Sequence, residues 1–184
     1  MTDIIKRFAN LTFKKMKIIF ISRFFPYIGG RESVVLSLAD YLSRDHDVAV
    51  ITPDIGRKSS QYQVFPYSPD TVVSVINDFK PDIINFHAFY LINDLIIDYC
   101  REKDIKTVLT LHGDLFNFGS EKDKEFFKSA SKKIDRIVAV CQQGMDAMEE
   151  NGTKKDKLDL IYNGVNVEIF KDYLLNKKAL RSAL

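Results

Sequence analysis

The sequence contains no tryptophan and only two cysteines, Cys100 and Cys141, among its 184 residues. Two cysteines cannot form a disulfide framework or a cysteine-rich metal cluster, and they predict reduced intracellular thiols. The formal net charge of +2 is too small to indicate nucleic-acid binding. No apolar run reaches the roughly 18 residues that span a bilayer, and residues 1–15 lack the apolar region of a signal peptide. These absences predict a soluble cytoplasmic protein.

Several familiar motifs are absent as well. The chain has no G-x-G-x-x-G and no G-x-x-x-x-G-K-[ST], which argues against a dinucleotide-dependent oxidoreductase and a P-loop enzyme. It has no G-x-S-x-G elbow for a serine hydrolase. His87, His112 and Asp114 are metal-ligand residue types, but no H-x-x-x-H or H-E-x-x-H spacing brings such ligands together. We therefore expect no metal ion and no cofactor.

The residues that are present predict a globular α/β domain. Hydrophobic residues make up 46% and charged residues 28% of the chain, and short apolar segments alternate with amphipathic ones. The expected strands are 18–21, 47–52, 62–65, 82–86, 107–111, 136–140 and 158–162. One expected helix starts just after Gly30, and the others cover 71–79, 91–103, 122–132 and 142–150. This alternation predicts a doubly wound, mainly parallel Rossmann-like sheet with helices on both faces.

The segment 17–42 is the best candidate for a ligand-binding element. An apolar strand leads into Gly29 and Gly30, after which apolar residues recur at helical spacing. A helix that begins there directs unpaired N–H groups and the positive end of its dipole toward the loop, which suits a phosphate. The glycines would let a ligand approach the backbone closely. The alternative is that the glycine pair only forms a tight turn.

Polar residues follow several of the predicted strands at one edge of the sheet. In a parallel sheet the carboxyl ends of the strands face the same crevice. His87, His112 and Asn163 each come at or just after the end of a predicted strand, so two of the three histidines belong to this edge. Asp104 and Asp135 precede strands at the opposite edge and are expected to serve turns or solvation.

Five segments together resemble family-4 glycosyltransferases. P-Y-I-G-G-R-E-S-V-V-L-S-L-A (26–39) resembles the "GG-x-E, then apolar helix" opening of that family. Its later landmarks are similar to P-D-I-I-N-F-H (81–87), V-L-T-L-H-G-D (108–114), I-V-A-V-C (137–141) and I-Y-N-G-V-N-V-E-I-F (161–170). The segments follow the family order at similar spacings. The resemblance covers residues 16–170.

The resemblance implies the GT-B architecture, in which two Rossmann-like domains face a cleft. The N-terminal domain mainly holds the acceptor, and the C-terminal domain holds the nucleotide-sugar; these enzymes retain anomeric configuration and generally need no metal. On this basis residues 16–170 form the acceptor-side domain, 1–15 an N-terminal extension and 171–184 the start of an interdomain linker. The nucleotide-sugar domain with its E-x₇-E motif would be absent, so we expect this fragment to be inactive alone.

The resemblance also implies roles for individual residues. Gly29 and Gly30 would face the donor diphosphate and sugar, and His112 would contact the donor sugar near the reacting centre. Glu32, His87 and Asn163 would line the acceptor side, although Asn163 is equally explained as part of a turn. The sequence departs from the family pattern at Cys141, where Ser or Thr is common, and at Asn166, where Asp is common.

Other partners and one other class of function remain open at this stage. A stand-alone, non-catalytic module with the same fold could bind a glycan or a protein. Residues 1–15 could pack on the domain, be disordered, or place a basic amphipathic segment against an anionic membrane surface, on the inner face of the membrane. Aromatic residues in the loops at the carboxyl edge predict self-association of the fragment. They are Phe24, Phe25, Tyr27, Phe89, Tyr90, Phe116 and Phe118.

Overall fold

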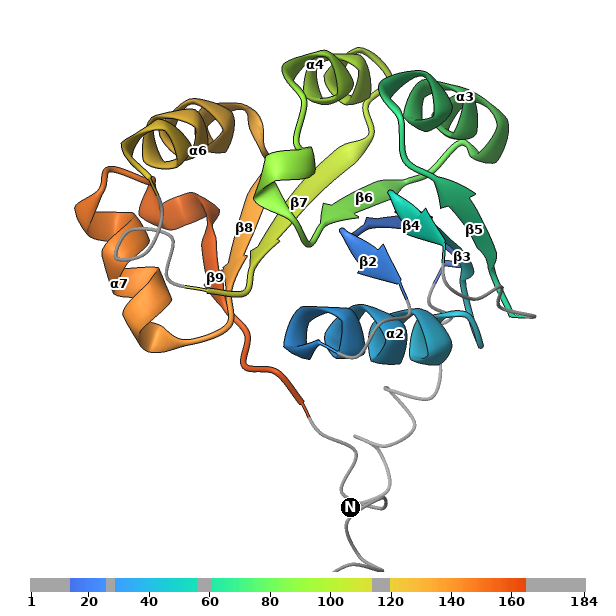
Figure 1. Cartoon of the computed structure of the whole chain (residues 1–184), viewed down its shortest axis with the longest axis horizontal. Coiled ribbons are helices and arrows are strands. Elements are labelled where there is room, and N and C mark those ends of the chain that lie inside the picture. Colours follow the sequence, from blue (N-terminus) through green and yellow to red (C-terminus); the bar gives the residue numbers. More distant parts are fainter. Residues whose placement is uncertain (1–13, 26–28, 56–60, 114–119, 165–184) are drawn as a thin grey trace, which may run out of the picture.

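The structure is a computed structural model that describes residues 14–25, 29–55, 61–113 and 120–164. Within these residues, seven parallel strands form one sheet in the order β5-β3-β1-β6-β7-β8-β9 (Figure 1). The strands of this sheet are β1 (Lys17–Ile21), β3 (Asp47–Thr52), β5 (Gln63–Pro66), β6 (Ile83–Phe86), β7 (Lys106–Leu111), β8 (Arg136–Ala139) and β9 (Leu158–Leu160). The helices are α2 (Gly30–Leu42), α3 (Pro69–Phe79), α4 (Asp94–Glu102), α6 (Glu121–Lys133) and α7 (Gln142–Glu150). The predicted doubly wound α/β fold is confirmed.

The helices pack on both faces of the sheet because successive side chains of each strand point to opposite faces. Ile18 and Phe20 of β1 pack with Val35 and Ala39 of α2 on one face. Alternate residues such as Ile19 lie in a larger cluster with the buried stripes of α3, α4 and α6, which cover the other face, and with Met148 of α7 (Figure 1). Burial of each Val, Ile, Phe or Met side chain in these clusters stabilises the fold by about 1.5–3 kcal/mol.

The element boundaries differ from the predicted ones where a local cap decides them. The predicted helix 91–103 is a 3-10 turn, η1 (Phe89–Leu91), followed by α4, because the Asn93 side chain accepts a hydrogen bond from the Leu95 amide at 2.8 Å and starts the helix there. Helix α3 begins earlier than predicted, at Pro69, because Ser68 caps it. The last strand ends at Leu160, two residues early. A short parallel pair, β2 (Phe24–Phe25) with β4 (Asp54–Ile55), was not predicted.

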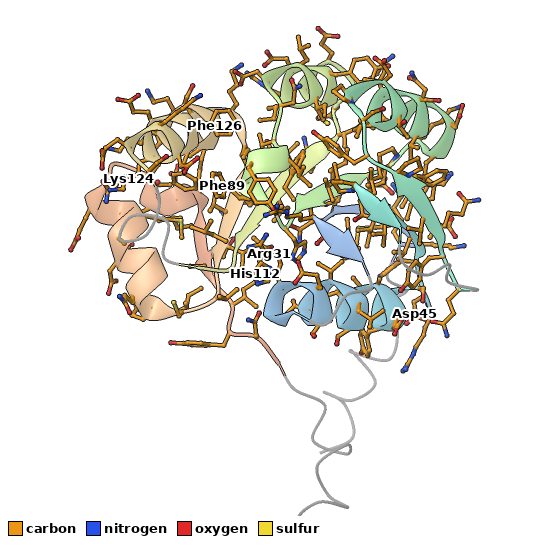
Figure 2. The ribbon with its side chains drawn as sticks, viewed as in Figure 1. Arg31, Asp45, Phe89, His112, Lys124 and Phe126 are labelled. Atoms are coloured by element: carbon orange, nitrogen blue, oxygen red, sulfur yellow. The ribbon has the colours of Figure 1, made fainter. Side chains whose placement is uncertain are left out.

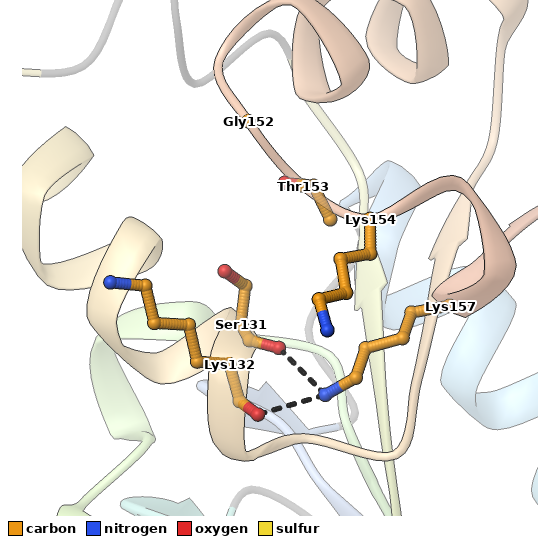
Figure 3. A pocket seen from close by; sticks show the side chains of 6 residues that line it. All are labelled: Ser131, Lys132, Gly152, Thr153, Lys154 and Lys157. Carbon is orange, nitrogen blue, oxygen red and sulfur yellow. Dashed lines mark hydrogen bonds between the residues drawn. The ribbon is translucent and has the colours of Figure 1, made fainter.

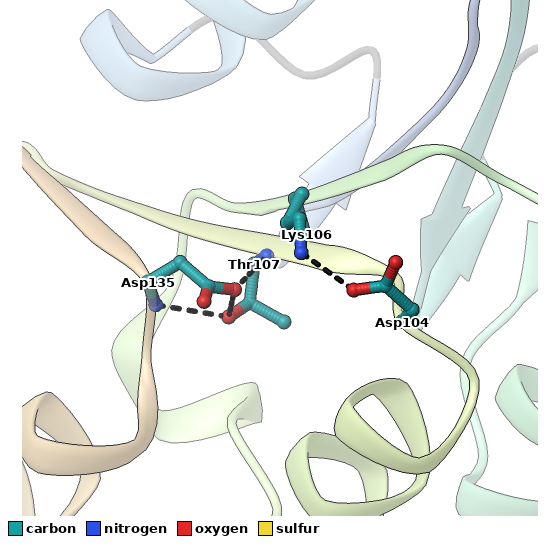
Figure 4. A network of polar contacts seen from close by, with 4 residues as sticks. All are labelled: Asp104, Lys106, Thr107 and Asp135. Atoms are coloured by element: carbon teal, nitrogen blue, oxygen red, sulfur yellow. Dashed lines mark hydrogen bonds and ion pairs between the residues drawn. The ribbon is translucent and has the colours of Figure 1, made fainter.

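Polar side chains bind the amino ends of neighbouring strands together. The Asp135 carboxylate, just before β8, accepts hydrogen bonds from the backbone N–H and the hydroxyl of Thr107 on β7, both at 2.8 Å (Figure 4). Asp104 pairs with Lys106 at the surface and takes a left-handed conformation with φ of 54°. Asp104 is a turn residue as predicted, whereas Asp135 does more than face solvent, because it joins two strands.

A pocket of about 340 Å³ also lies at the amino edge, between the end of α6 and the segment after α7 (Figure 3). The Lys157 ammonium, from the 3-10 turn η2 (Lys155–Lys157), donates hydrogen bonds to the carbonyl oxygens of Ser131, Lys132 and Ile134 at 3.3, 2.8 and 2.7 Å. These bonds satisfy the last turn of α6 and place a positive charge at the negative end of its dipole. Lys157 therefore has a structural role.

Candidate functional site

Two histidines are in direct contact at the carboxyl edge of the sheet. His87 directly follows β6 and His112 directly follows β7, and these strands are neighbours in the sheet. Nδ1 of His87 lies 2.7 Å from Nε2 of His112, within hydrogen-bond distance. The two rings lie edge to edge across this contact, with centroids 5.0 Å apart and an angle of 28° between their planes. The structure therefore brings together the two histidines that the sequence places at the same edge.

The surroundings keep both imidazoles neutral. His87 is only 2% exposed, and its ring lies edge-on to Phe20 with centroids 5.6 Å apart. Burial, reinforced by the charges of His112 and Arg31, lowers the pKa of His87 to about 3. Burial and the Arg31 charge lower the pKa of His112, which is half-buried, to about 4. Near pH 7 each ring therefore carries one N–H donor and one nitrogen acceptor.

The amino end of α2 faces this histidine pair. Arg31, in the first turn of α2, is the charged residue that acts on both rings, and Figure 2 shows it beside His112. Its Nη1 atom donates a hydrogen bond to the hydroxyl of Tyr90 at 3.1 Å, and the guanidinium carbon lies 5.9 Å from the centre of that ring. Arg23 also lies over the Tyr90 ring, at 5.3 Å. A cationic group and the positive end of a helix dipole thus adjoin two neutral imidazoles.

Neither Arg31 nor Tyr90 was predicted to belong to the site, although Tyr90 was among the edge aromatic residues expected to favour self-association. Arg31 follows the glycine pair directly and Tyr90 comes three residues after His87. Position next to the chosen site residues is the only signal that could have found them.

The two glycines at this helix end differ in what surrounds them. Gly29 is the N-cap residue in an extended conformation, and no side chain caps α2. A Cβ atom added at Gly30 would meet no atom within 4 Å, whereas one added at Gly29 would collide with the carboxylate of Glu32. The Glu32 carboxylate therefore lies against the start of α2, where a negative charge is favourable. Gly30 is open to a ligand.

Three buried polar atoms at this edge lack a hydrogen-bond partner among the described residues. They are Ser22 Oγ, Arg31 Nε and His87 Nε2. Ser22 directly follows β1, whose last residue Ile21 is level with Phe86, so Ser22 is beside His87 in the sheet. Buried unsatisfied polar groups are rare in folded proteins and need a specific explanation, such as a functional role.

The structure does not place the remaining predicted residues in the histidine site. Asn163 is exposed beyond the end of β9, and within the described part of the chain no hydrogen bond joins it to the histidine pair. Cys141 is exposed and is the N-cap residue of α7. Asp114 and Asn166 lie outside the described residues, as do Tyr27, Phe116 and Phe118 and nearly all of the two terminal segments 1–15 and 171–184.

No group of three or more His, Cys, Asp or Glu side chains in the described part of the chain is arranged to hold a metal ion. Among the described helices, none combines the length and the apolar character that crossing a bilayer requires.

Comparison with known proteins confirms the resemblance seen in the sequence. Residues 28–169 match the model of Glycosyltransferase Family 4. The chain is 28% identical over 172 residues to an uncharacterized glycosyltransferase of Methanocaldococcus jannaschii, and the match covers 84% of this chain and 48% of that protein. The chain thus spans about half the length of the curated relatives it matches.

Solved structures share the fold. Anabaena HepE, in complex with UDP-glucose, superposes with a TM-score of 0.67 at 15% identity, over 91% of this chain and 50% of that one. Sucrose-phosphate synthase from Thermosynechococcus elongatus also gives a TM-score of 0.67 at 15% identity, over 88% of this chain and 53% of the other. At this identity the likeness establishes a common architecture, the Rossmann-like domain of GT-B proteins.

Proposed function

The chain belongs to Glycosyltransferase Family 4, and we propose that it is the acceptor-side half of an enzyme that moves a sugar from a nucleotide-sugar donor to an acceptor hydroxyl, with retention of anomeric configuration. The observation that carries this proposal is the neutral His87–His112 pair beside the amino end of α2. The fold alone would suit many activities, so the argument depends on this site.

The start of α2 is suited to the phosphate end of the donor. Helices α3, α4 and α6 have side-chain caps from Ser68, Asn93 and Ser120. Helices α2 and α7 have none, and of these two α2 is the one that begins at glycines. Its first N–H groups are available to a ligand oxygen, and the open space at Gly30 lets that ligand reach the backbone. There these N–H groups would stabilise the negative charge that develops on the departing diphosphate.

His112 is suited to hold the sugar. Its ring is neutral near pH 7 and half-buried, so it orients a sugar hydroxyl by hydrogen bonding rather than by charge. Its low pKa makes it a weak general base. We therefore propose that the departing phosphate, rather than His112, takes the proton of the acceptor hydroxyl.

The acceptor-side roles of Glu32, His87 and Asn163 stay predictions. Glu32 lies at the start of α2, next to the proposed donor phosphate, and His87 lies behind His112 with 2% of its surface exposed. Of these residues, Asn163 is the one that is exposed. The acceptor itself is not specified by any of these contacts.

The surface around the site is suited to a second domain. Exposed large hydrophobic side chains follow or adjoin the carboxyl ends of β6 and β9, namely Tyr90, Leu95, Ile161 and Tyr162. A nucleotide-sugar-binding domain opposite this edge would cover them. We therefore expect the isolated chain to bind donors weakly and to show no turnover.

Substitution of Gly30 by alanine tests the proposal. The added methyl group has space in the free chain and would intrude only on a ligand, so we expect an unchanged unfolding transition and a large loss of sugar transfer when the chain is joined to its donor-binding domain. Gly144→Ala is the matched control, because its Cβ would make only an ordinary contact with Cys141 Sγ at 3.4 Å, away from α2. Equal transfer rates in both variants would contradict the proposed donor site.

Calorimetry of the isolated chain with UDP-glucose tests the division of labour. We expect weak binding; tight binding by this half alone would contradict the proposal.

Binding of a glycan without transfer in any longer form of the protein would favour the non-catalytic module instead. The anomeric configuration of a product, read by NMR, tests retention.

A further inference from the structure

The hydrogen bond between His87 and His112 couples the tautomers of the two rings. Two neutral imidazoles share one proton in such a bond. If His87 Nδ1–H donates, His112 accepts at Nε2 and must carry its own proton on Nδ1. If His112 Nε2–H donates, His87 accepts at Nδ1 and must carry its proton on Nε2. In either case both rings have the same tautomer.

We propose that His87 is a positioning residue that fixes the orientation and the tautomer of His112, so that Nδ1 of His112 is the nitrogen presented to substrate. The value of this to sugar transfer rests on the proposed function, whereas the arrangement of the pair does not. His112 Nε2 is directed at a side chain that is 2% exposed, so this nitrogen is not available to a ligand. Nδ1 is the ring nitrogen that remains.

His87 is held too firmly to turn away from His112. Its backbone N–H donates to the carbonyl oxygen of Ile21 on β1 at 2.8 Å, which continues the strand pairing past the end of β6. Its ring lies edge-on to Phe20 and meets the His112 ring edge to edge through the hydrogen bond. A rigid buried partner of this kind can fix a neighbouring imidazole, as the groups behind metal-bound and catalytic histidines do.

The buried groups around His87 select one of the two tautomers. Arg31 Nε is a buried donor without an acceptor, and His87 Nε2 is a buried atom without a partner, among the described residues. A proton on His87 Nε2 would add another unmet donor close to a positive guanidinium. A lone pair there is the less costly choice, because unmet buried N–H groups are the rarer kind. We therefore assign the Nδ1–H tautomer to both rings.

This assignment has a chemical consequence for the site. His112 would present an N–H donor to the ligand while remaining uncharged. Such a group suits an oxygen acceptor, either a sugar hydroxyl or a phosphate oxygen.

Long-range ¹H–¹⁵N correlation spectra of the three histidine side chains, recorded on the chain near pH 7, test the assignment directly. We expect Nδ1–H patterns for His87 and His112. His46 is an internal reference for the other form, because its Nδ1 accepts a hydrogen bond from the Met16 N–H at 3.3 Å and its proton therefore lies on Nε2. Different tautomers in His87 and His112, or averaging between tautomers in His112, would overturn the proposal.

Two substitutions separate the hydrogen bond from the packing. His87→Phe keeps a ring but removes the bond, so His112 should average between tautomers. His87→Asn offers an amide near the position of Nδ1, so His112 should keep its Nδ1–H form. Retention of the fixed tautomer in His87→Phe would overturn the proposal, because packing alone would then be responsible. If His87→Phe does not fold, the wild-type and His87→Asn spectra still decide.

Transfer assays with the joined donor-binding domain distinguish failure of the inference from failure of the function. We expect His87→Phe to lower kcat roughly 10–100-fold with little change in KM, and His87→Asn to restore much of it. A fixed tautomer in a chain that never supports transfer would refute the function but not the positioning. Equal kcat in wild type and His87→Phe would refute the positioning role but not the function.

Discussion

The amino and carboxyl edges of the sheet treat their polar groups in opposite ways. At the amino edge, Asp82 accepts a hydrogen bond from the Lys17 N–H, Asp135 accepts two from Thr107, and Lys157 donates to the end of α6. At the carboxyl edge, buried atoms of Ser22, Arg31 and His87 have no partner among the described residues.

The difference indicates what each edge is for. The amino edge contains carboxylates and ammonium groups that satisfy backbone groups, so its polar side chains contribute to stability. The carboxyl edge contains neutral histidines with lowered pKa values, an uncapped helix start and exposed hydrophobic side chains. Such groups are tolerated where a ligand or a second domain supplies the missing contacts. Substitutions at the two edges should therefore have separable effects.

The largest expected effect is on activity, from His112→Ala. Removal of the group that orients the sugar should lower kcat roughly 10²–10³-fold when transfer is assayed with the donor-binding domain. Lys106→Ala, at the opposite end of the same strand β7, is the control and should leave kcat unchanged. A similar loss in both variants would mean that the two edges are not functionally distinct.

The second largest expected effect is a loss of folding stability in Asp135→Ala. This change leaves the Thr107 N–H, in a fully buried residue, without its acceptor, so the free energy of unfolding should fall by about 1–3 kcal/mol. Urea unfolding measures it. Asp104→Asn, which removes only the exposed pair with Lys106, should have no measurable effect. An unchanged urea midpoint for Asp135→Ala would contradict the structural role that we propose for the amino edge.

The pH dependence of stability should reveal the buried histidines. Their native pKa values of about 3 and about 4 lie below the ordinary 6.5, so below about pH 6.5 the unfolded chain binds protons that the native chain does not. Stability should therefore be fully present above this pH and fall as the pH decreases toward the native pKa values. For His87 the slope approaches about 1.4 kcal/mol per pH unit. Urea midpoints between pH 7 and pH 5 should fall less steeply for His87→Phe; parallel curves would contradict the burial of a neutral His87.

The smallest effect is on self-association. Tyr162 at the carboxyl edge and Tyr41 on α2 are 66% and 65% exposed, which makes them a matched pair. If the carboxyl edge is the surface that a second domain covers, Tyr162→Ser should weaken self-association of the isolated chain and Tyr41→Ser should not. Sedimentation velocity over a range of concentrations measures both. A strictly monomeric wild-type chain would refute this prediction.

Much of the fold could be predicted because strand and helix periods are local. The strand 47–52 and the helix 142–150 match the structure residue for residue. The direct contact of His87 with His112 could not be predicted from the sequence, because it depends on the register of β6 against β7. Phe86 is level with Leu109, so His112 lies two residues beyond the level of His87 and its ring reaches back. Arg31 was missed because no pattern distinguishes a first-turn arginine that faces the site from one that faces solvent.

The most direct test of the central claim is to map where a donor contacts this chain. In ¹H–¹⁵N spectra of the assigned chain titrated with UDP-glucose, we predict that the amide signals of Gly30, Arg31 and His112 shift, and that those of Thr153 and Lys154 beside the amino-edge pocket do not. Shifts confined to Thr153 and Lys154, with none at the start of α2, would contradict the account.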